Sequence, residues 1–536
     1  MSEEIITDFD SLLNKLNGFG KYQKFNLILT CVTAFITGVA SLDFVFVTGI
    51  PDYRCRIPEC DNENVTEYTP NWLKNAVPYE NGNPKYCSRF ALQNETIRNT
   101  SDLCPAELFS RDNVIQCEYN ELIFPDDHKT IVNDFEIYCE DNQWKLSMVG
   151  TFSSLGVILG GPICGFISDR YGRHKILVIS GVLTSIFGIA KSFSTIIEEY
   201  IVLDVMNTIV SYTLYSTAFI LGIELVGPSH RLLAATANNI CLASGGIFLG
   251  LAAWNINSWR TLLRVLYAPA IIIFFYWWLM CESIKWLISK NKFDEIRKIL
   301  GKISKVNNRP LPENYEAFLK NEENQTETEI SIKNVFKNRT LCLRFINCCI
   351  LFLGNNIVYF GLSLYSVALT GHKYMNFIII EFVEIPGNIL CAIILNRYSR
   401  RLTLRISYLL TGICCILLYF ITEGDTIKII IYTIGKLMAT IASNTMYVFT
   451  TELFPTTVRH STLNICYAVG GIGSMLAPQT PLLALIWTPL TVITLGSFSL
   501  LASVLTIFFP ETYNKELPDT IAESEHISKT STVTKL

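Results

Sequence analysis

The sequence predicts an all-α membrane protein with twelve transmembrane helices in two six-helix pseudo-repeats and a large extracellular loop between helices 1 and 2. Half of the 536 residues are hydrophobic and only 17% are charged, against roughly 25% charged residues in soluble domains. Uncharged stretches long enough to cross a bilayer recur along the chain, and two pairs of short motifs repeat at matching spacing. The net charge of −4 excludes electrostatic binding of nucleic acid as a main function.

The twelve spans follow from length and charge. A helix needs about 20 mostly apolar residues to cross a bilayer core. The stretches without Asp, Glu, Lys or Arg are 146–168, 232–258, 345–371 and 461–510, and the last is long enough for two spans, with three prolines to turn between them. Seven further candidates are shorter or carry a charge, namely 26–50, 176–197, 200–223, 265–281, 374–396, 406–422 and 429–451.

The segment 49–143 separates the first two spans and has the composition of an extracellular loop. It holds 8 Lys and Arg against 18 Asp and Glu, six cysteines and three N-x-S/T sequons. These features together predict a glycosylated, disulfide-linked loop, although some sequons can be unused and some cysteines free. Six cysteines allow fifteen pairings, and the sequence does not choose among them. The residues concerned are Asn64, Asn94 and Asn99 for glycosylation, and Cys55, Cys60, Cys87, Cys104, Cys117 and Cys139 for disulfides.

Orientation follows from the basic clusters at 168–175 and 397–405, because Lys and Arg in short loops stay cytoplasmic. Both clusters precede odd-numbered spans, so an even number of spans places both termini in the cytoplasm. The expected divisions are a cytoplasmic N-terminus (1–25), a first half (26–281), a cytoplasmic linker (282–339), a second half (340–510) and a cytoplasmic tail (511–536).

An internal repeat supports the two halves. The string D-R-Y-G-R-H at 169–174 is echoed by N-R-Y-S-R-R at 396–401, and E-L-V-G-P-S-H-R at 224–231 by E-L-F-P-T-T-V-R at 452–459. The arginine-to-glutamate spacing is 54 residues in the first half and 55 in the second. Duplication of this kind is typical of transporters that rock around a substrate near the bilayer midplane.

The charges in these motifs predict a cytoplasmic gate that forms when the inner face is closed and breaks when it opens. Positive-inside topology alone would explain the arginines, but not the acids at fixed positions. The candidate gate residues are Asp169, Arg170, Arg173, Glu224, Arg231, Arg397, Glu452 and Arg459.

These motifs resemble those of the major facilitator superfamily, and specifically of its organic-ion transporter family, which carries organic cations, anions and carnitine. The resemblance covers almost the whole chain and includes the large loop between spans one and two. It implies the major facilitator fold, a central aromatic cavity and alternating access without ATP. The further matching strings are P-D-Y-R-C-R-I-P at 51–58, C-E-S-I-K-W-L-I at 281–288, Y-F-G-L-S-L at 359–364, E-I-P at 384–386, and P-E-T with L-P-D-T between 510 and 520.

The resemblance also implies cavity positions. Aromatic faces can hold a cationic ligand, each contact contributing roughly 0.5–2 kcal/mol, although any single aromatic residue can equally serve helix packing. Phe352 stands where cation transporters of the family have a cavity tryptophan. The positions carried over are Tyr215, Asn238, Phe352, Tyr359, Phe360 and Glu384.

Three departures from the family pattern limit this inference. Asp204 stands where relatives usually have an arginine on span four, which puts proton coupling in doubt. Gly471 replaces the charged residue that distinguishes cation from anion transporters on span eleven. Asn396 and Ser399 replace an acid and a glycine in the second-half gate motif, which predicts a weaker gate there.

Charges at membrane depth cost roughly 2.5–3.5 kcal/mol each on insertion scales and are therefore functional candidates. We expect the Lys191 side chain to reach the membrane–water interface and Glu384 to pair with Lys436. Asp43 and Asp204 are then left to face the cavity or each other, unless they bond to helix hydroxyls, and the excess of acids favours cationic or zwitterionic cargo. The six charges are Asp43, Lys191, Asp204, Glu381, Glu384 and Lys436.

The sequence thus predicts a plasma-membrane transporter of small organic cations or zwitterions, working as a uniporter or exchanger. The alternatives are a transporter-like receptor or adhesion protein that acts through its ectodomain, and an organic anion transporter. The six histidines form no H-x-x-x-H pattern, so we expect neither an enzyme nor a metal or other cofactor. The expected partners are the small organic ion and the lipid bilayer, and the C-terminal 534–536 has the form that PDZ scaffolds bind.

Overall fold

The computed structural model describes most of the chain, including every span expected from the sequence. The described residues are 9–61, 68–80, 83–85, 87–93, 104–117, 122–124, 128–139, 142–312, 315–316, 319, 338–369, 371–421, 424–455, 458–487, 489–513, 515, 518 and 521–525. The expected glycosylation sites Asn64, Asn94 and Asn99, and the C-terminal 534–536, lie outside these residues.

In the described part of the chain, twelve helical segments are long and apolar enough to cross a membrane, which agrees with the predicted number. Their cores are α2 (Lys21–Ser41), α6 (Gln143–Tyr171), α7 (Arg173–Lys191), α8 (Ile197–Glu224), α9 (Arg231–Asn255) and α10 (Trp259–Tyr267) in the first half. The second half holds α16 (Arg339–Tyr365), α17 (Lys373–Arg397), α18 (Arg400–Phe420), α19 (Asp425–Leu453), α20 (Arg459–Leu476) and α22 (Leu490–Leu505).

Six spans are extended by short helical pieces, among them η4 (Pro228–His230) before α9 and η6 (Ser366–Ala368) after α16. After α2 comes a break at Leu42 and Asp43, and then α3 (Phe44–Val47). The sixth span continues through η5 (Ala268–Phe275) and α11 (Tyr276–Leu279), and the last through η8 (Thr506–Phe508). The 50-residue uncharged stretch divides as expected, because α20 continues through η7 (Ala477–Leu482) into α21 (Leu483–Ile486), and Pro489 begins α22.

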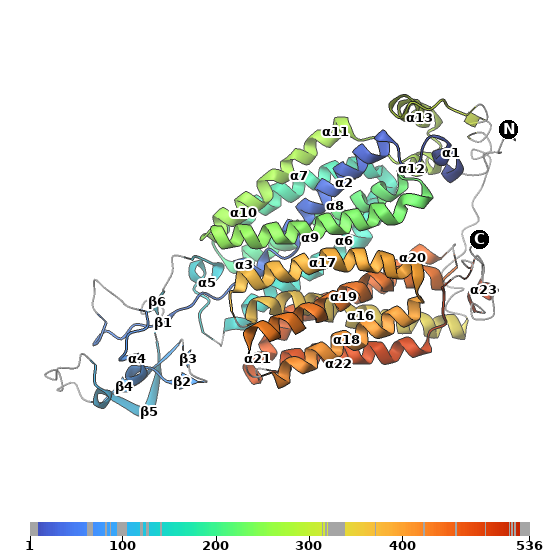
Figure 1. Cartoon of the computed structure of the whole chain (residues 1–536). Coiled ribbons are helices and arrows are strands. Elements are labelled where there is room, and N and C mark those ends of the chain that lie inside the picture. The colour runs from blue at the N-terminus through green and yellow to red at the C-terminus, as the bar shows by residue number, and fades with distance from the viewer. Residues whose placement is uncertain are drawn as a thin grey trace.

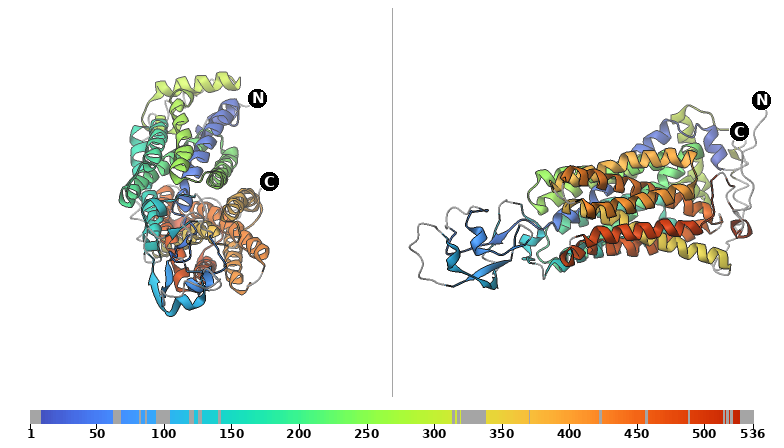
Figure 2. Two further views of the ribbon diagram at one scale, coloured as in Figure 1. Left: turned by 90° about the vertical axis from the view of Figure 1, so that its left-hand side faces the viewer. Right: turned by 60° about the horizontal axis from the view of Figure 1, so that its bottom comes forward.

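The helices form two bundles that lie side by side (Figures 1 and 2). In the first bundle α2 packs on α9, and α8 packs on both α6 and α7. In the second, α16 packs on α20, and α18 on α19 and α22. The bundles meet where α9 contacts α17 and where α6 contacts α20. These two seams enclose the space between the halves.

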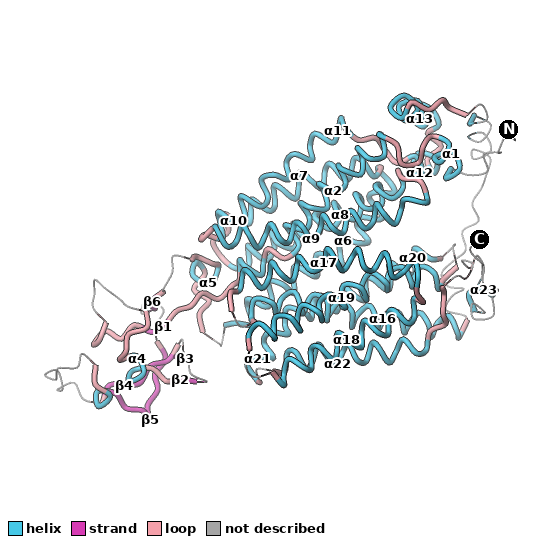
Figure 3. The backbone as a smooth tube through the Cα atoms, viewed as in Figure 1, coloured by secondary structure: helices cyan, strands magenta, loops and turns pink. Residues whose placement is uncertain are grey.

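The segment between α3 and α6 lies beyond one end of the bundles, which we call the loop end (Figure 3). Its strands form three antiparallel pairs: β1 (Arg54–Cys55) with β6 (Leu122–Ile123), β2 (Tyr79–Glu80) with β3 (Asn83–Pro84), and β4 (Ser88–Leu92) with β5 (Phe109–Gln116). All six expected cysteines are paired, as Cys55–Cys117, Cys60–Cys104 and Cys87–Cys139. Short helices α4 (Leu73–Ala76), η1 (Ala106–Leu108) and α5 (Ile131–Asp134) complete this segment.

The opposite end carries α1 (Phe9–Lys15), α12 (Ile284–Ser289), α13 (Phe293–Asn307) and α23 (Ile521–Glu525), and we call it the linker end (Figure 1). Helix α13 is amphipathic: Ile296, Ile299, Leu300 and Ile303 recur at helical spacing and are buried in one apolar cluster with Leu12 of α1. The linker therefore begins as a packed part of the first half.

Candidate functional site

A cavity of about 200 Å³ lies between the two halves. Four of the residues carried over from the family resemblance line it: Tyr215, Tyr359, Phe360 and Glu384. Residues of both halves contribute to its wall, as a substrate site shared by two rocking bodies requires. The remaining lining residues include Thr37, Leu42, Phe44, Ser153, Ser154, Val157, Thr208, Ser211, Tyr212, Ser363, Glu381, Tyr467, Ser474 and Pro478.

The expected pair of Glu384 and Lys436 is confirmed. The Lys436 Nζ lies 2.8 Å from Glu384 Oε1, donates to the Ser363 hydroxyl at 2.7 Å, and lies 3.7 Å from the centre of the Tyr359 ring. The Tyr359 hydroxyl donates to the same Glu384 oxygen at 2.6 Å. Lys436 is fully buried, so this pairing satisfies a charge that would otherwise be very costly at membrane depth.

Glu381 is a second carboxylate on the same wall. It precedes Glu384 by one helical turn of α17, lines the cavity, and is only 5% exposed. The Ser363 hydroxyl contacts it at 3.5 Å, and among the described residues no ion pair neutralises it. Two carboxyl groups share one ammonium on this wall, so the wall carries one excess negative charge only when both glutamates are ionised.

Tyrosine rings surround the opposite side of the cavity. Tyr212 stacks on Tyr467 across the two halves at 6.0 Å between ring centres, and Tyr467 contacts Tyr447 at 5.9 Å. The sequence reasoning missed Tyr212 and Tyr467. Tyr212 precedes Tyr215 by three residues and so shares its helix face, a signal that could have identified it. No local sequence pattern distinguishes Tyr467 from a tyrosine that serves only helix packing.

An amide chain connects the wall across the halves. The Tyr215 hydroxyl donates to Asn239 at 3.1 Å, Asn239 donates to Asn444 at 3.3 Å, and Asn444 donates to Asn388 at 2.7 Å. Asn388 donates in turn to the Glu384 carbonyl at 2.9 Å. The aromatic wall of one half is thereby linked to the acidic wall of the other.

Two expected cavity residues lie elsewhere. Phe352 is fully buried and packs edge-on against Tyr447 at 5.4 Å, so it supports the aromatic wall from behind. Asn238 is buried and donates to the Ala234 carbonyl at 2.9 Å within its own helix. Gly471 faces Ile158 of α6, where its missing side chain allows α20 and α6 to approach closely.

The expectations for Asp43 and Lys191 need correction. Lys191 does not reach the interface but is fully buried, with its Nζ 2.7 Å from both Asp43 Oδ2 and Asp204 Oδ1. Asp43 therefore binds Lys191 and does not line the cavity, and Asp204 faces the same ammonium. Burial of one ammonium between two carboxylates is favoured because each charge would be costly alone.

The first-half gate residues pair within their own half. Arg173 and Glu224 form an ion pair. Glu282 accepts the backbone N–H groups of Arg173 at 2.9 Å and His174 at 3.0 Å, which are the first donors of α7. Asp169 and Arg170 lie exposed at the end of α6. These contacts hold together the start of α7, the end of α8 and the segment before α12.

The second half repeats this arrangement with a different arginine. Arg400, and not the expected Arg397, pairs with Glu452 at 3.3 Å, while Arg397 is exposed at the end of α17. Glu511 accepts the Arg400 N–H at 3.0 Å, as Glu282 does in the first half. The substituted Ser399 caps α18 and its hydroxyl donates to Glu511.

The remaining gate candidates also have partners outside the expected scheme. Arg231 binds Asp10 of α1 at 2.5 Å and so ties the N-terminal helix to the start of α9. Arg459 is the first residue of α20. The ion pairs Arg173–Glu224, Arg231–Asp10 and Arg400–Glu452 each lie within one half.

The loop end, by contrast, is held together by direct contacts between halves. Ser154 donates to the Ser474 carbonyl at 3.0 Å, Thr151 to the Met475 carbonyl at 3.1 Å, and Gln479 to the Thr151 hydroxyl at 2.6 Å. Phe46 of α3 stacks on Tyr374 of α17 at 5.5 Å. This end of the cavity is therefore closed.

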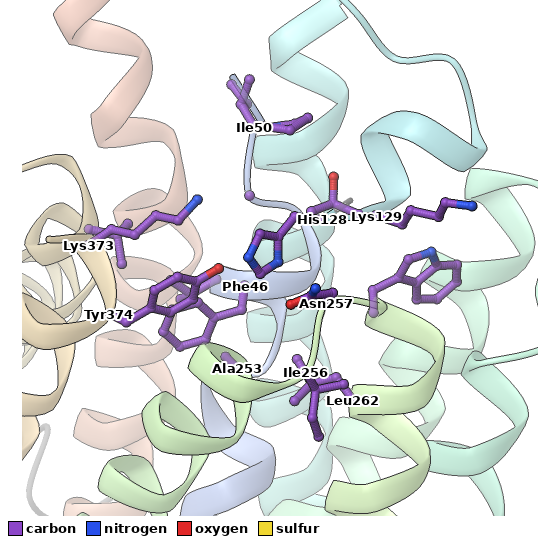
Figure 4. Close-up of a pocket in the computed structure, with 16 residues that line it drawn as sticks. Phe46, Ile50, His128, Lys129, Ala253, Ile256, Asn257, Leu262, Lys373 and Tyr374 are labelled. Atoms are coloured by element: carbon purple, nitrogen blue, oxygen red, sulfur yellow. The ribbon is translucent and has the colours of Figure 1, made fainter. Parts of the chain in front are cut away.

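A second, smaller pocket of about 130 Å³ opens beyond this closure (Figure 4). The His128 ring lies between Phe46 and Tyr374 on one side and Asn257 on the other, and Lys373 reaches toward the same space. Loop, first half and second half all contribute to this pocket. In the described part of the chain, no group of three His, Cys, Asp or Glu residues is placed to hold a metal ion.

Comparison with known proteins agrees with this architecture. The family model of the sugar (and other) transporters matches residues 113–521. Mouse solute carrier family 22 member 21 is 30% identical over 97% of this chain and 94% of its own length. The Drosophila melanogaster organic cation transporter protein is 30% identical over 97% and 95%, and human organic cation/carnitine transporter 2 is 28% identical over 96% and 93%.

Solved structures show the same fold. The partially occluded inward-open conformation of the xylose transporter XylE from E. coli superposes with a TM-score of 0.62 at 15% identity. The match covers 92% of this chain and all of that chain. At this identity the likeness concerns the fold alone.

Proposed function

This chain belongs to the organic-ion transporter group of the sugar (and other) transporter family, and from that premise we propose that it carries small organic cations or zwitterions across the plasma membrane by alternating access. Its relatives are transporters and not enzymes, and the twelve spans make it a multi-pass membrane protein. Alternating access without ATP fits two rocking halves around one cavity.

The excess carboxylate in the cavity wall carries this proposal. Lys436 pairs with Glu384, whereas Glu381 is buried beside the cavity with no ion-pair partner among the described residues, so it is an uncompensated negative charge whenever it is ionised. A cationic group in the cavity would balance that charge, and an unbalanced charge at this depth is costly. An anionic substrate would meet the same carboxylate and be repelled.

The aromatic lining supports the same substrate class. Tyr215, Phe360 and Tyr212 present rings to the cavity, and a desolvated cation gains roughly 0.5–2 kcal/mol from each well-placed ring. The hydroxyls of Ser154 and Ser211 line the first-half wall. Ser154 already donates to the Ser474 carbonyl, so the Ser211 hydroxyl is the donor available to the carboxylate of a zwitterion, and a molecule with both charges has partners on both walls.

The orientation that we propose places the loop end outside and both termini in the cytoplasm. The acidic loop with its three disulfides belongs in an oxidising compartment, and the basic clusters lie toward the linker end. With the loop end closed by Ser154, Thr151 and Gln479, the conformation corresponds to the stage at which substrate exchanges with the cytoplasm.

Uptake of labelled compounds by cells that express the protein tests the proposal. We expect saturable uptake of one or more organic cations or zwitterions from a panel that also includes anions. Glu381→Gln should lower the uptake of a cation about tenfold or more, because it removes the uncompensated charge. The matched control is Glu198→Gln, which neutralises an exposed glutamate at the start of α8.

Two outcomes would contradict the proposal. Uptake of anions alone, unchanged by Glu381→Gln, would reassign the substrate class. No uptake of any compound, with the protein shown at the cell surface, would favour a receptor-like role for the loop.

A further inference from the structure

A second buried charge cluster lies outside the cavity, in the first half. Lys191 ends α7, Asp43 lies at the break between α2 and α3, and Asp204 lies on α8. The Tyr267 hydroxyl of α10 lies 3.2 Å from the Lys191 Nζ and donates to Asp43 Oδ2 at 2.8 Å. Asn207 donates to the same hydroxyl at 2.9 Å. Four spans of one bundle thus meet at one ammonium.

The cluster carries more acid than base. Lys191, Asp43 and Asp204 are each at most 2% exposed. The other titratable groups that face them are the hydroxyls of Tyr200 and Tyr267, with the Lys191 Nζ 5.8 Å and 4.8 Å from the two ring centres. The nearby Arg260 is turned toward Asp134 and the Ser192 carbonyl, and Arg264 toward the Ser192 hydroxyl. One ammonium therefore balances only one of two buried carboxylates.

One oxygen of the cluster makes no hydrogen bond of ordinary geometry, although the Ser153 hydroxyl faces the same carboxyl group. Asp204 Oδ1 binds Lys191, but Asp204 Oδ2 is buried without a hydrogen bond. An ionised carboxylate would leave this oxygen desolvated and unpaired, at considerable cost. A proton on Oδ2 would make the carboxyl neutral and leave the cluster with one negative and one positive charge.

A sodium ion is a poorer fit for this space. The Lys191 Nζ already lies 2.7 Å from a carboxylate oxygen of each acid, so a metal cation there would face an ammonium at close range. A proton needs only the free oxygen of Asp204. The geometry therefore selects a proton over a metal cation.

The cluster lies directly behind the cavity wall. Asp43 stands between Leu42 and Phe44, which both line the cavity. Ser153 and Thr208 also line it. Their hydroxyls bond to each other at 3.1 Å, Thr208 donates to the Asp204 carbonyl at 2.8 Å, and Ser153 faces the Asp204 side chain. Two hydroxyls thus lie between the cavity and the free carboxylate oxygen.

We propose that the Lys191–Asp43–Asp204 cluster is a proton-binding site of the transport cycle, in which Asp204 Oδ2 takes up one proton and releases it on the other side, together with the substrate. The step is a proton transfer alone: the carboxylate becomes a carboxyl and is later deprotonated. Coupling to a substrate rests on the proposed function. The cluster shares no residue with the acidic wall of the cavity, so a proton and a cationic substrate can be bound at the same time. The coupling that we propose is therefore co-transport.

Asp43 lies at the break between α2 and α3, so protonation of Asp204 can affect the position of α3. Protonation of Asp204 leaves Asp43 as the only charged partner of Lys191 and strengthens that pair. Asp43 is joined to α3, whose Phe46 forms the contact with Tyr374 that closes the loop end. The protonated cluster therefore favours a fixed position of α3.

The first test needs no substrate. Infrared spectra of the purified full-length protein are recorded over a pH series, and we expect a protonated-carboxyl band that titrates reversibly. Asp204→Asn and Asp43→Asn, each combined with Glu381→Gln so that the cavity carboxyl does not contribute, should each abolish that band, because one carboxylate and one ammonium then balance in the cluster. The control Asp134→Asn, which removes a partly exposed carboxylate beside Arg260, should retain it. A wild type without the band, or an Asp204→Asn/Glu381→Gln protein that keeps it, overturns the proposal.

The second test measures coupling in proteoliposomes that contain a pH-sensitive dye. Entry of a transported cation should acidify the lumen, and Asp204→Asn should lower this proton movement about tenfold while equal-pH exchange of labelled for unlabelled substrate persists. Substrate entry without proton movement, or with movement in the opposite direction, overturns the coupling. If no compound exchanges in the wild type, the proposed function fails, and the infrared titration alone decides the proton site.

Discussion

At the scale of single residues, the function depends on where a few buried charges find partners. Lys436 is fully buried among Glu384, Ser363 and the Tyr359 ring. Glu381, one turn away, has a hydroxyl contact but no cation among the described residues. The difference between these two glutamates, and not the number of acids in the span, is the basis of the cation site that we propose.

Lys436→Met should destabilise the protein by about 3–5 kcal/mol, because it leaves Glu384 buried without its cation. The double variant Lys436→Met/Glu384→Gln should recover most of that loss, because the neutral glutamine at position 384 no longer needs a cation. Thermal unfolding of the purified proteins measures both. Equal melting temperatures for the single and double variants would show that the pair contributes nothing.

At the scale of helices, the duplicated motifs fasten the ends of spans within each half. Glu282 and Glu511 occupy equivalent positions and accept the first N–H groups of α7 and α18. Each is followed by a hydroxyl residue that donates to the glutamate of the neighbouring span, Ser283 to Glu224 and Thr512 to Glu452. The repeated motifs therefore make equivalent contacts in the two halves, and these contacts join the ends of spans within each half.

Glu282→Gln and Glu511→Gln should each lower stability by about 1–2 kcal/mol, because an amide binds helix N–H groups less strongly than a carboxylate. Glu295→Gln, on the exposed face of α13, is the matched control and should change little. Melting temperatures in detergent provide the measurement. A loss confined to one of the two variants would contradict their equivalence.

The contacts at the loop end belong to the same scale. Thr151 both donates to the Met475 carbonyl and accepts from Gln479, so Thr151→Val removes two hydrogen bonds between the halves. We expect it to weaken the loop-closed state by about 1–3 kcal/mol and to raise labelling of a cysteine placed on the cavity wall from the loop side. Ser497→Ala, which removes a hydroxyl bonded only within α22, is the control, and equal labelling would reject the prediction.

At the scale of the whole molecule, the outer part of the disulfide-linked loop has an apolar core of its own. It buries its own apolar cluster, which includes Ile57, Leu73, Val77 and Leu108. The Arg54–Asp61 pair at 2.7 Å lies within it. The base of the loop, by contrast, packs into the first bundle: Tyr53 and Tyr138 lie in one apolar cluster with Leu146 and Trp259, and Asp134 binds Arg260.

Replacing Cys60 and Cys104 with serine should therefore destabilise the loop by about 2–4 kcal/mol and leave the bundles folded. Limited proteolysis should cut the variant within the loop at protease concentrations that spare the wild type, while the bundle fragment keeps its melting temperature. Loss of the bundle's own transition would show instead that loop and bundles fold together.

The sequence by itself determined the features that depend on local composition. Apolar length specified twelve spans, since a bilayer accepts a helix by its length and polarity. The acid excess and cysteines of 49–143 specified a disulfide-linked loop, and repeated motifs specified two halves. The pairing of Glu384 with Lys436 could also be predicted from the sequence, because two opposite charges at similar membrane depth have few alternative partners.

Only the tertiary structure decided which side chains meet. Lys191 lies 148 residues from Asp43 in the sequence, and its position near a span end suggested the membrane interface instead of a buried cluster. Phe352 and Asn238 have cavity-compatible sequence positions but are rotated into helix contacts, while Tyr467 is rotated toward the cavity. Helix rotation and packing set these partners, and they depend on contacts between distant spans that no local pattern encodes.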